Sequence, residues 1–277
     1  MWDFPFKDNG LFATYVFMTP ETDHGEIEQL VLDEYENIKQ NGINNDEIKR
    51  AKQGLRSKQE ERRHLLWEAL NKQQRISWDK VSLACDNADA SFNRVWRQQS
   101  VTWTVRERLG VVLNELGRTL PEDVFALVIR DYEEMEIKIT PDMIEGAADA
   151  VRDLAKDFQL AVVSDAIVSP GRCLRQWLGL HDILDCFQSF AFSDEVGHSK
   201  PHPDMFSKVS VDLNVPIKNM IHVGDREHND IQGPHALGMK AVLFSGTRNK
   251  DRRNTTADAV CDRHRDLPSI VRQLADH

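Results

Sequence analysis

The second half of the chain alternates short apolar segments with stretches of helical spacing, and this alternation constrains the fold more than any other feature. Stretches of about 10–15 residues with helical periodicity separate the apolar segments. Short buried strands joined by helices are typical of a parallel, doubly wound sheet. We therefore predict a Rossmann-like α/β fold for residues 141–277. The expected strands are Leu160–Ser164, Phe190–Ser193, Met220–Val223 and Ala241–Phe244, and the expected helices lie at 144–156, after Pro170, from Pro203, after Asn229 and from Leu267.

The first half of the chain has a different texture. Residues 59–140 carry helical spacing, so we expect a helical domain there. The β-branched and aromatic segment 11–18 predicts a strand, and two amphipathic helices are expected to follow it. The polar stretch from Arg56 to His64 is typical of a solvated helix face and marks a change of register. The chain thus begins with a strand-helix-helix appendage ahead of the helical domain.

Composition excludes several classes of function. A length of 277 residues suggests about two domains, and the net charge of −10 argues against a nucleic-acid or anionic-membrane partner. We find neither an apolar run long enough to span a membrane nor a secretion leader. The 4 cysteines are scattered and are expected to be free thiols. We expect a soluble, cytoplasmic protein.

Polar residues follow three of the predicted strands, at the edge where doubly wound sheets bind their ligands. They are Ser164 and Asp165 after the first strand, Lys200 in the loop after the second, and Asp225 and Asp230 after the third. Each alone also fits a turn, a helix cap or a solvated loop. Together, a hydroxyl, a cation and a carboxylate pair suit an oxyanion with a hard divalent cation such as Mg²⁺.

These residues, in this order, resemble the haloacid dehalogenase (HAD) superfamily of hydrolases, in its subgroup with a helical cap, here residues 59–140. Ser164 matches the second motif of the family. Lys200, in Ser-Asp-Glu-Val-Gly-His-Ser-Lys-Pro-His-Pro, matches the third, and Gly-Asp225-x-x-x-Asn-Asp230 matches the fourth. The resemblance implies a Mg²⁺-dependent phosphatase of a small phosphorylated metabolite. In such an enzyme Ser164, Asp165 and Lys200 would bind the phosphate, with Ser164 and Lys200 catalytic. Asp225 and Asp230 would hold the metal.

The first motif of the family is missing. That motif is an apolar strand ending in Asp-x-Asp-x-Thr, and no Asp-x-Asp occurs before residue 140. By the resemblance, it would supply both the nucleophile and the acid/base. We leave the nucleophile unassigned, with Glu21, Asp23 and Asp165 as imperfect candidates. Loss of a covalent nucleophile typically lowers turnover by orders of magnitude. We therefore expect very weak or absent turnover.

Residues 8–58 resemble part of a different protein family. The text Asn-Asn-Asp-Glu-Ile-Lys-Arg-Ala-Lys-Gln-Gly-Leu at 44–55 is similar to a fragment of a pitrilysin/insulinase-type metallopeptidase. The zinc motif of that family, His-x-x-Glu-His, is absent, so zinc proteolysis is not expected. We interpret the chain as a fusion: a peptidase-like fragment at 1–58 without a zinc site, a cap at 59–140, and at 141–277 a HAD-like core lacking its nucleophile strand.

Several alternatives stay open. The absent strand is central in HAD proteins, so its neighbours should expose unpaired backbone. Segment 11–18 either fills that position or packs only with its own helices, and we favour the second.

The function is either an active phosphatase, a HAD-like pseudoenzyme, or an interaction module arising from the fusion. A dehalogenase is disfavoured because it needs no metal pair, and an incomplete sheet edge would favour oligomers. The histidines His198, His202, His222, His228 and His235 lack metal-ligand spacing and are expected to be loop or core residues.

Overall fold

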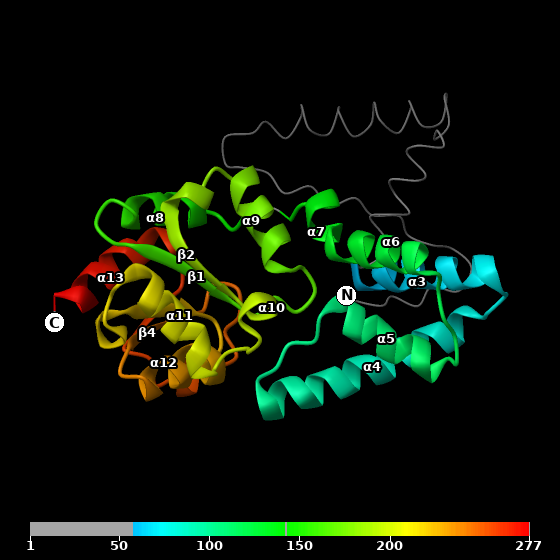
Figure 1. The fold of residues 1–277 in the computed structure, drawn as a ribbon. Coiled ribbons are helices and arrows are strands. Elements are labelled where there is room, and N and C mark those ends of the chain that lie inside the picture. Colours follow the sequence, from blue (N-terminus) through cyan, green and yellow to red (C-terminus); the bar gives the residue numbers. More distant parts are fainter. Residues whose placement is uncertain (1–57, 142, 277) are drawn as a thin grey trace, which may run out of the picture. The chain divides into compact units, whose positions relative to one another are not determined.

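The computed structural model describes residues 58–141 and 143–276, so the segment 11–18 and its expected helices lie outside the described residues. The described part opens with a helical region (Figure 1). Its helices are α3 (Lys58–Gln73), α4 (Trp78–Gln99), α5 (Val105–Glu115), α6 (Glu122–Glu133) and α7 (Met135–Lys138). Helix α3 packs against both α4 and α6.

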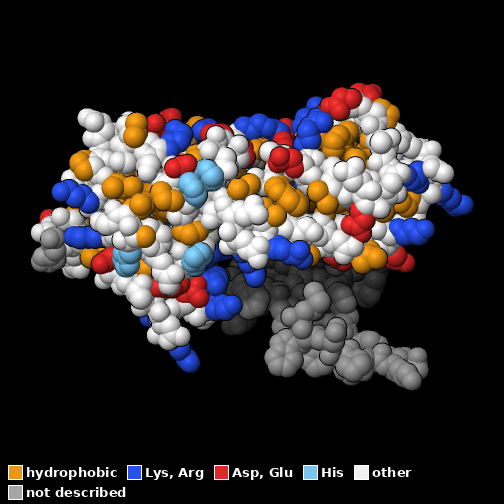
Figure 2. Space-filling view, turned by 60° about the horizontal axis from the view of Figure 1, so that its bottom comes forward, with side chains coloured by type: hydrophobic (Ala, Val, Ile, Leu, Met, Phe, Trp, Pro, Cys, Tyr) orange, Lys and Arg blue, Asp and Glu red, His pale blue; other side chains and the backbone are white. Residues whose placement is uncertain are grey.

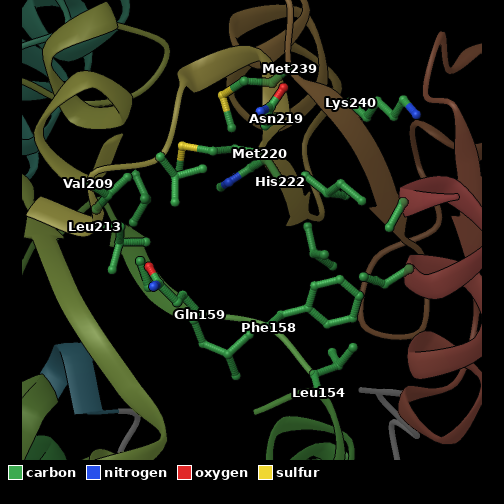
Figure 3. A pocket seen from close by; sticks show the side chains of 18 of the residues that line it. Leu154, Phe158, Gln159, Val209, Leu213, Asn219, Met220, His222, Met239 and Lys240 are labelled. Atoms are coloured by element: carbon green, nitrogen blue, oxygen red, sulfur yellow. The ribbon is translucent and has the colours of Figure 1, made fainter. Parts of the chain in front are cut away.

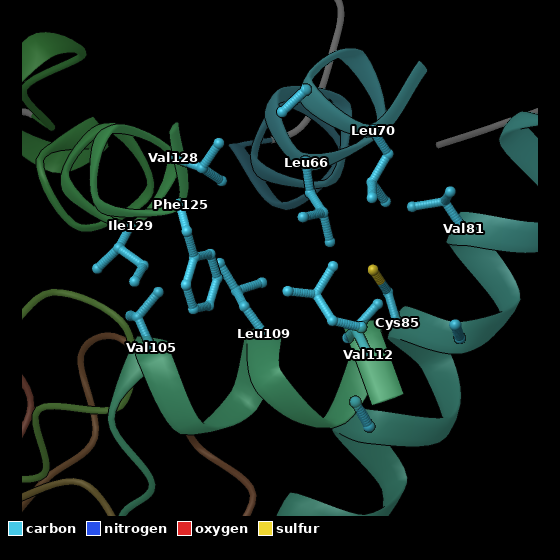
Figure 4. Close-up of a cluster of buried hydrophobic side chains, with 14 residues drawn as sticks. Leu66, Leu70, Val81, Cys85, Val105, Leu109, Val112, Phe125, Val128 and Ile129 are labelled. Carbon is cyan, nitrogen blue, oxygen red and sulfur yellow. The ribbon is translucent and has the colours of Figure 1, made fainter. Parts of the chain in front are cut away.

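A buried apolar cluster holds the helical region together (Figure 4). Leu66 of α3, Val81 of α4 and Leu109 of α5 point into it and are almost completely buried. Helix α5 begins with a capping box, in which Thr104 and Glu107 satisfy each other's main-chain N–H groups. The apolar spacing noted in the sequence therefore becomes the shared core of a small helical bundle.

The prediction of a solvated helix face at the start of α3 is wrong for Arg62 and Arg63, whereas Gln59 and Glu60 are exposed. Arg62 is only 7% exposed, and its Nε donates to the carbonyl oxygen of Tyr132 at 3.1 Å. A second guanidinium nitrogen of Arg62 lies 3.1 Å from Glu136. Arg63 pairs with Asp89 of α4 at 3.0 Å. Acceptors on α4, α6 and α7 make burial of these cations tolerable, and the sequence of α3 alone does not reveal them.

The second region contains the expected alternation of strands and helices. All four predicted strands are present, with ends shifted by a few residues. A fifth, three-residue strand was not predicted. The strands are β1 (Leu160–Ser164), β2 (Phe187–Phe192), β3 (Ile221–Gly224), β4 (Lys240–Phe244) and β5 (Ala259–Cys261), and the helices are α8 (Ala147–Leu154), α9 (Gly171–Leu180), α10 (Ser193–Val196), α11 (Pro203–Leu213), a π-helix at Glu227–Gln232, α12 (Gly233–Ala236) and α13 (Leu267–Ala275). Short 3₁₀ turns lie at Leu184–Cys186, Ile217–Asn219, Arg252–Asn254 and His264–Asp266.

The strands are parallel, which confirms the α/β fold class, but they form two sheets among the described residues. Strand β1 pairs with β2, and β4 pairs with β3 on one side and β5 on the other. Among the described residues, the predicted parallel sheet is therefore in two pieces. The break lies between β1 and β3, whose residues both line a cavity of about 890 Å³ (Figure 3).

None of the helices that the structure describes has the length and apolar character needed to cross a membrane. On the face shown in Figure 2, lysine and arginine side chains are scattered among acidic and apolar ones. That face therefore carries mixed charge without a field of one sign.

Candidate active site

Three loops from different strands meet at the carboxylate of Asp165, directly after β1. Its Oδ1 accepts a hydrogen bond from the main-chain N–H of Lys200 at 2.8 Å, and its Oδ2 accepts one from the side-chain amide of Asn229 at 3.1 Å. Lys200 follows β2 and α10, whereas Asn229 follows β3. The carboxyl ends of the two sheets are thus joined through one side chain, and the polar residues predicted from the sequence lie at one edge.

The second connection is an ion pair between Lys200 and Asp230. The Nζ of Lys200 lies 2.6 Å from Asp230 Oδ1, with 12% and 3% of the two side chains exposed. His222 Nε2 also lies 3.1 Å from this oxygen, and the N–H of Arg226 donates to Oδ2 at 3.0 Å. The carboxylate rests against Gly224, where a Cβ would lie 2.3 Å from Asp230 Cγ. Glycine at 224 is therefore required by this close approach.

These contacts set the charge states in the site. Burial alone would raise the pKa of Asp230, but the hydrogen bond with His222 and the positive charge of Lys200 outweigh it and hold that pKa well below its usual range. Burial lowers the pKa of His222, so the ring is neutral near pH 7. A neutral imidazole facing an ionised carboxylate must donate, which places its proton on Nε2. Burial raises the pKa of Asp165, partly opposed by the charge of Lys200.

Two of the predicted site residues keep unengaged side chains. Neither the hydroxyl of Ser164, at the end of β1, nor the carboxylate of Asp225, just after β3, makes a hydrogen bond to another described residue. The main-chain carbonyl of Asp225 is held by Arg248, whose guanidinium donates to it at 3.0 Å. The turn at Asp225 is therefore fixed while its side chain stays open to a ligand.

The donor set at this edge fits Mg²⁺. The ion takes oxygen ligands, keeps several waters, and needs only one or two protein carboxylates. Asp230 is ionised and has one Oδ2 lone pair left beside the bond from Arg226, and neither oxygen of Asp225 bonds to another described residue. Asp225 and Asp230 would hold the ion, as the sequence predicts.

A network of hydroxyl groups ties the helical region to these loops, and nothing in the sequence pattern pointed to it. Thr102, in the segment between α4 and α5, donates to Ser193 Oγ at 2.9 Å and makes a short hydrogen bond with Ser199. Ser193 in turn accepts the N–H of Ala166 at 2.8 Å, and Ser199 donates its N–H to the carbonyl of Ser100 at 2.7 Å. The loops that carry Asp165 and Lys200 are therefore braced by the helical region.

The predicted histidines divide between core and surface. His222 is buried in the site, whereas His198 and His202 lie with Asp204 at the start of α11. Their nearest nitrogens are 3.5 Å and 3.6 Å from Asp204 Oδ2, a grouping that sequence spacing did not suggest. The two rings are stacked 3.7 Å apart and nearly parallel. An ion must lie in the plane of each imidazole that binds it, so this arrangement cannot ligate one metal through both rings.

Comparison with known proteins decides the family. Residues 88–244 match the sequence profile of the haloacid dehalogenase-like hydrolases. The chain belongs to the haloacid dehalogenase-like hydrolase family. This stretch contains Ser164, Lys200, Asp225 and Asp230, as the resemblance of the motifs predicted. A separate match, to the inactive domain of M16 peptidases, covers residues 4–55 and agrees with the predicted peptidase-like fragment.

Several named relatives of this HAD-like chain are phosphatases. It is 32% identical over 177 residues to a glyceraldehyde 3-phosphate phosphatase of Methanopyrus kandleri, covering 60% of this chain and 71% of that protein. It is 38% identical over 80 residues to a protein of the same name from Pyrococcus abyssi, but spans only 34% of that protein and 28% of itself.

A solved structure shows the same fold. The HAD-hydrolase YfnB of Bacillus subtilis, described as putative and bound to magnesium, superposes with a TM-score of 0.51 at 18% identity. The superposition covers 76% of this chain and 91% of that one. At this level of identity the likeness supports the architecture of the HAD-like chain and nothing finer.

Proposed function

We propose that the site binds the phosphate group of a small phosphorylated metabolite together with Mg²⁺, and that it hydrolyses the ester far more slowly than a complete phosphatase. The proposal rests on the ion pair between Lys200 and Asp230. Asp165, after β1, links the two loops that carry this pair, because its carboxylate accepts hydrogen bonds from the main chain of Lys200 and from the side chain of Asn229. Ser164 and Asp225 lie beside this network with unengaged side chains. The site therefore offers a cation, a hydroxyl and carboxylates in one place.

Each residue has a role that follows from its chemistry. The hydroxyl of Ser164 donates to a phosphoryl oxygen, and the ammonium of Lys200 neutralises part of the phosphate charge. Asp225 and Asp230 would hold Mg²⁺, which when bound supplies charge neutralisation and orients the phosphate. Asp165 acts as a positioning residue because it fixes the main chain at Lys200 and the side chain of Asn229.

Slow turnover is expected because the described residues place no carboxylate as a nucleophile. Each oxygen of Asp165 accepts one hydrogen bond, so the carboxylate is held in place by Lys200 and Asn229 as a structural link between two loops. Asp230 is held by Lys200, and Asp225 is needed for the metal. The remaining candidates, Glu21 and Asp23, lie outside the described residues. Removal of a covalent nucleophile typically lowers turnover by several orders of magnitude.

The proposed substrate class rests on the relatives. Two of them are named for a phosphorylated three-carbon sugar, which is consistent with a small phosphorylated metabolite. The second candidate function is a pseudoenzyme that binds its ligand without turning it over, or an interaction module arising from the fusion. The break between β1 and β3 favours this second candidate, since the sheet is interrupted beside the site.

Phosphate binding by the full chain tests the proposal. Inorganic phosphate is titrated by calorimetry in the presence of Mg²⁺ into the parent chain, Lys200→Met and Lys208→Met. Lys208 pairs with Asp212 on the surface of α11, away from the strand ends, and serves as the matched control. We expect Lys200→Met to weaken binding by about 10- to 100-fold, the worth of a charge-assisted hydrogen bond. Equal binding by all three proteins, or none by the parent, would contradict the proposal.

A further inference from the structure

The cavity between β1 and β3 lies where the parallel sheet is interrupted. Residues 160–163 of β1 line one side and residues 220–223 line the other. Figure 3 shows Leu154, Phe158, Leu213, Met220 and His222 around an open centre. The volume of about 890 Å³ far exceeds that of a cavity left by one missing side chain.

The two strands that border the cavity lack a partner on that side among residues 58–141 and 143–276. Among the described strands, β1 pairs only with β2, and β3 pairs only with β4. All five residues of β1 are half-buried, and so is most of β3. By contrast, β4 has a strand on each side and is almost entirely buried. The main-chain groups on the facing edges of β1 and β3 therefore still need hydrogen-bond partners.

The remaining walls of the cavity are apolar and belong to the two layers of helices. Ala161 and Val163 of β1, with Met220, pack against the cluster of α11. Leu160 of β1, with Ile221 of β3, packs against the cluster of α8 and α13. The side chains of both strands thus alternate between the same two layers. An occupant of the cavity would meet apolar side chains above and below it and main-chain edges on both sides.

We propose that this cavity binds an extended, apolar segment of another polypeptide as a strand parallel to β1 and β3. Only an extended peptide backbone offers N–H and C=O groups along both of its edges at once, so it alone can satisfy the two facing strands. The two helical layers require a segment that is apolar on both faces, rich in β-branched residues and free of proline. About five residues suffice, the usual length of a strand.

The direction of the segment follows from the site. Strands β1 and β3 run the same way, since Asp165 after β1 bonds to Asn229 after β3. A parallel segment between them ends beside Asp165, so its following residue reaches the edge where Lys200 pairs with Asp230. The inference goes beyond the proposed function and does not depend on it, because main-chain pairing needs no phosphate or metal.

Hydrogen exchange and peptide binding test the proposal on the full chain. The probe is a labelled peptide of about ten residues with a Val/Ile core flanked by lysines, and the control peptide has proline at the core's centre. We expect the first peptide to bind at least about tenfold more tightly, since proline removes a hydrogen bond and clashes in a central strand. On binding, those main-chain amides of β1 and β3 that face the cavity should exchange about tenfold more slowly, whereas those of β4 stay unchanged.

Two variants of α11 locate the binding. Val209 is fully buried and lines the cavity, so Val209→Trp fills it, whereas Val211 is 77% exposed on the same helix. We expect Val209→Trp to weaken peptide binding about tenfold or more and Val211→Trp to leave it unchanged. If Val209→Trp does not fold, the proline control still decides the question. The proposal is overturned if both peptides bind alike, or if the edge amides of β1 are already as protected as those of β4 without any peptide.

Discussion

Replacing Lys200 by methionine probes the central ion pair of the site. The Nζ of Lys200 lies 2.6 Å from Asp230 Oδ1, and both side chains are largely buried. Methionine keeps the apolar stem of the side chain and removes the charge. The carboxylate of Asp230 is then buried opposite His222 and the N–H of Arg226 alone.

The size of the effect can be worked from these contacts. Removing one partner of a buried ion pair destabilises a protein by about 3–5 kcal/mol. Because two hydrogen-bond donors still face Asp230, we expect a loss of about 3 kcal/mol, the lower end of that range. The surface pair Lys208–Asp212 has an N–O distance of 2.7 Å but exposes 39% and 36% of its side chains. Solvent screens that pair, so Lys208→Met should cost only about 0.5 kcal/mol.

Urea unfolding followed by circular dichroism measures both free energies under the same conditions. The double variant Lys200→Met/Asp230→Asn should recover part of the loss, since it removes the unpaired charge. The reasoning is refuted if Lys200→Met costs no more than Lys208→Met, because the ion pair would then carry no more weight than a solvated one.

Three further predictions follow from the pKa shifts and the packing. The pKa of Asp230 is held low, so its ionised form stabilises the fold above about pH 4, and this contribution is lost as the pH falls further. The difference in the free energy of unfolding between the parent and Asp230→Asn should therefore shrink below that pH. Burial raises the pKa of the Cys85 thiol to about 11, so iodoacetamide at pH 8 should label the half-buried Cys186 long before Cys85, as mass spectrometry would show. Leu66 is fully buried in the helical region, so Leu66→Ala should lower the free energy of unfolding by about 3 kcal/mol, and a loss below about 1 kcal/mol would contradict the packing described.

Strand positions were largely predictable from the sequence because a buried parallel strand is a short run of apolar residues. Leu160–Ser164 stands out as an apolar run between polar helices, and its bounds agree with β1. The three-residue strand β5 was missed because Ala259–Cys261 is too short to show a period. The helix expected after Asn229 begins earlier, as a π-helix that contains Asp230. A hydrogen-bonding pattern of that kind leaves no signature in apolar spacing.

The candidate site was predictable in its charged members and not in the contacts that position them. Lys200 and Asp230 follow strand ends, where a parallel sheet collects its polar side chains. The contact of His222 with Asp230 joins a strand residue to a residue of the following π-helix, and the bond from Asn229 to Asp165 spans 64 positions. Such contacts depend on how loops close in three dimensions. Thr102 lies far from the site in sequence and carries no motif.

Hydrolysis of p-nitrophenyl phosphate in the presence of Mg²⁺ tests the central claim most directly. The purified full chain is compared with an Asp225→Ala variant prepared in the same way, so that any contaminating phosphatase contributes equally to both. The account predicts that turnover by the parent chain exceeds that of Asp225→Ala only slightly, since the proposed site has no carboxylate assigned as its nucleophile. Clear turnover by the parent chain that disappears in Asp225→Ala would contradict it and would reveal a working nucleophile.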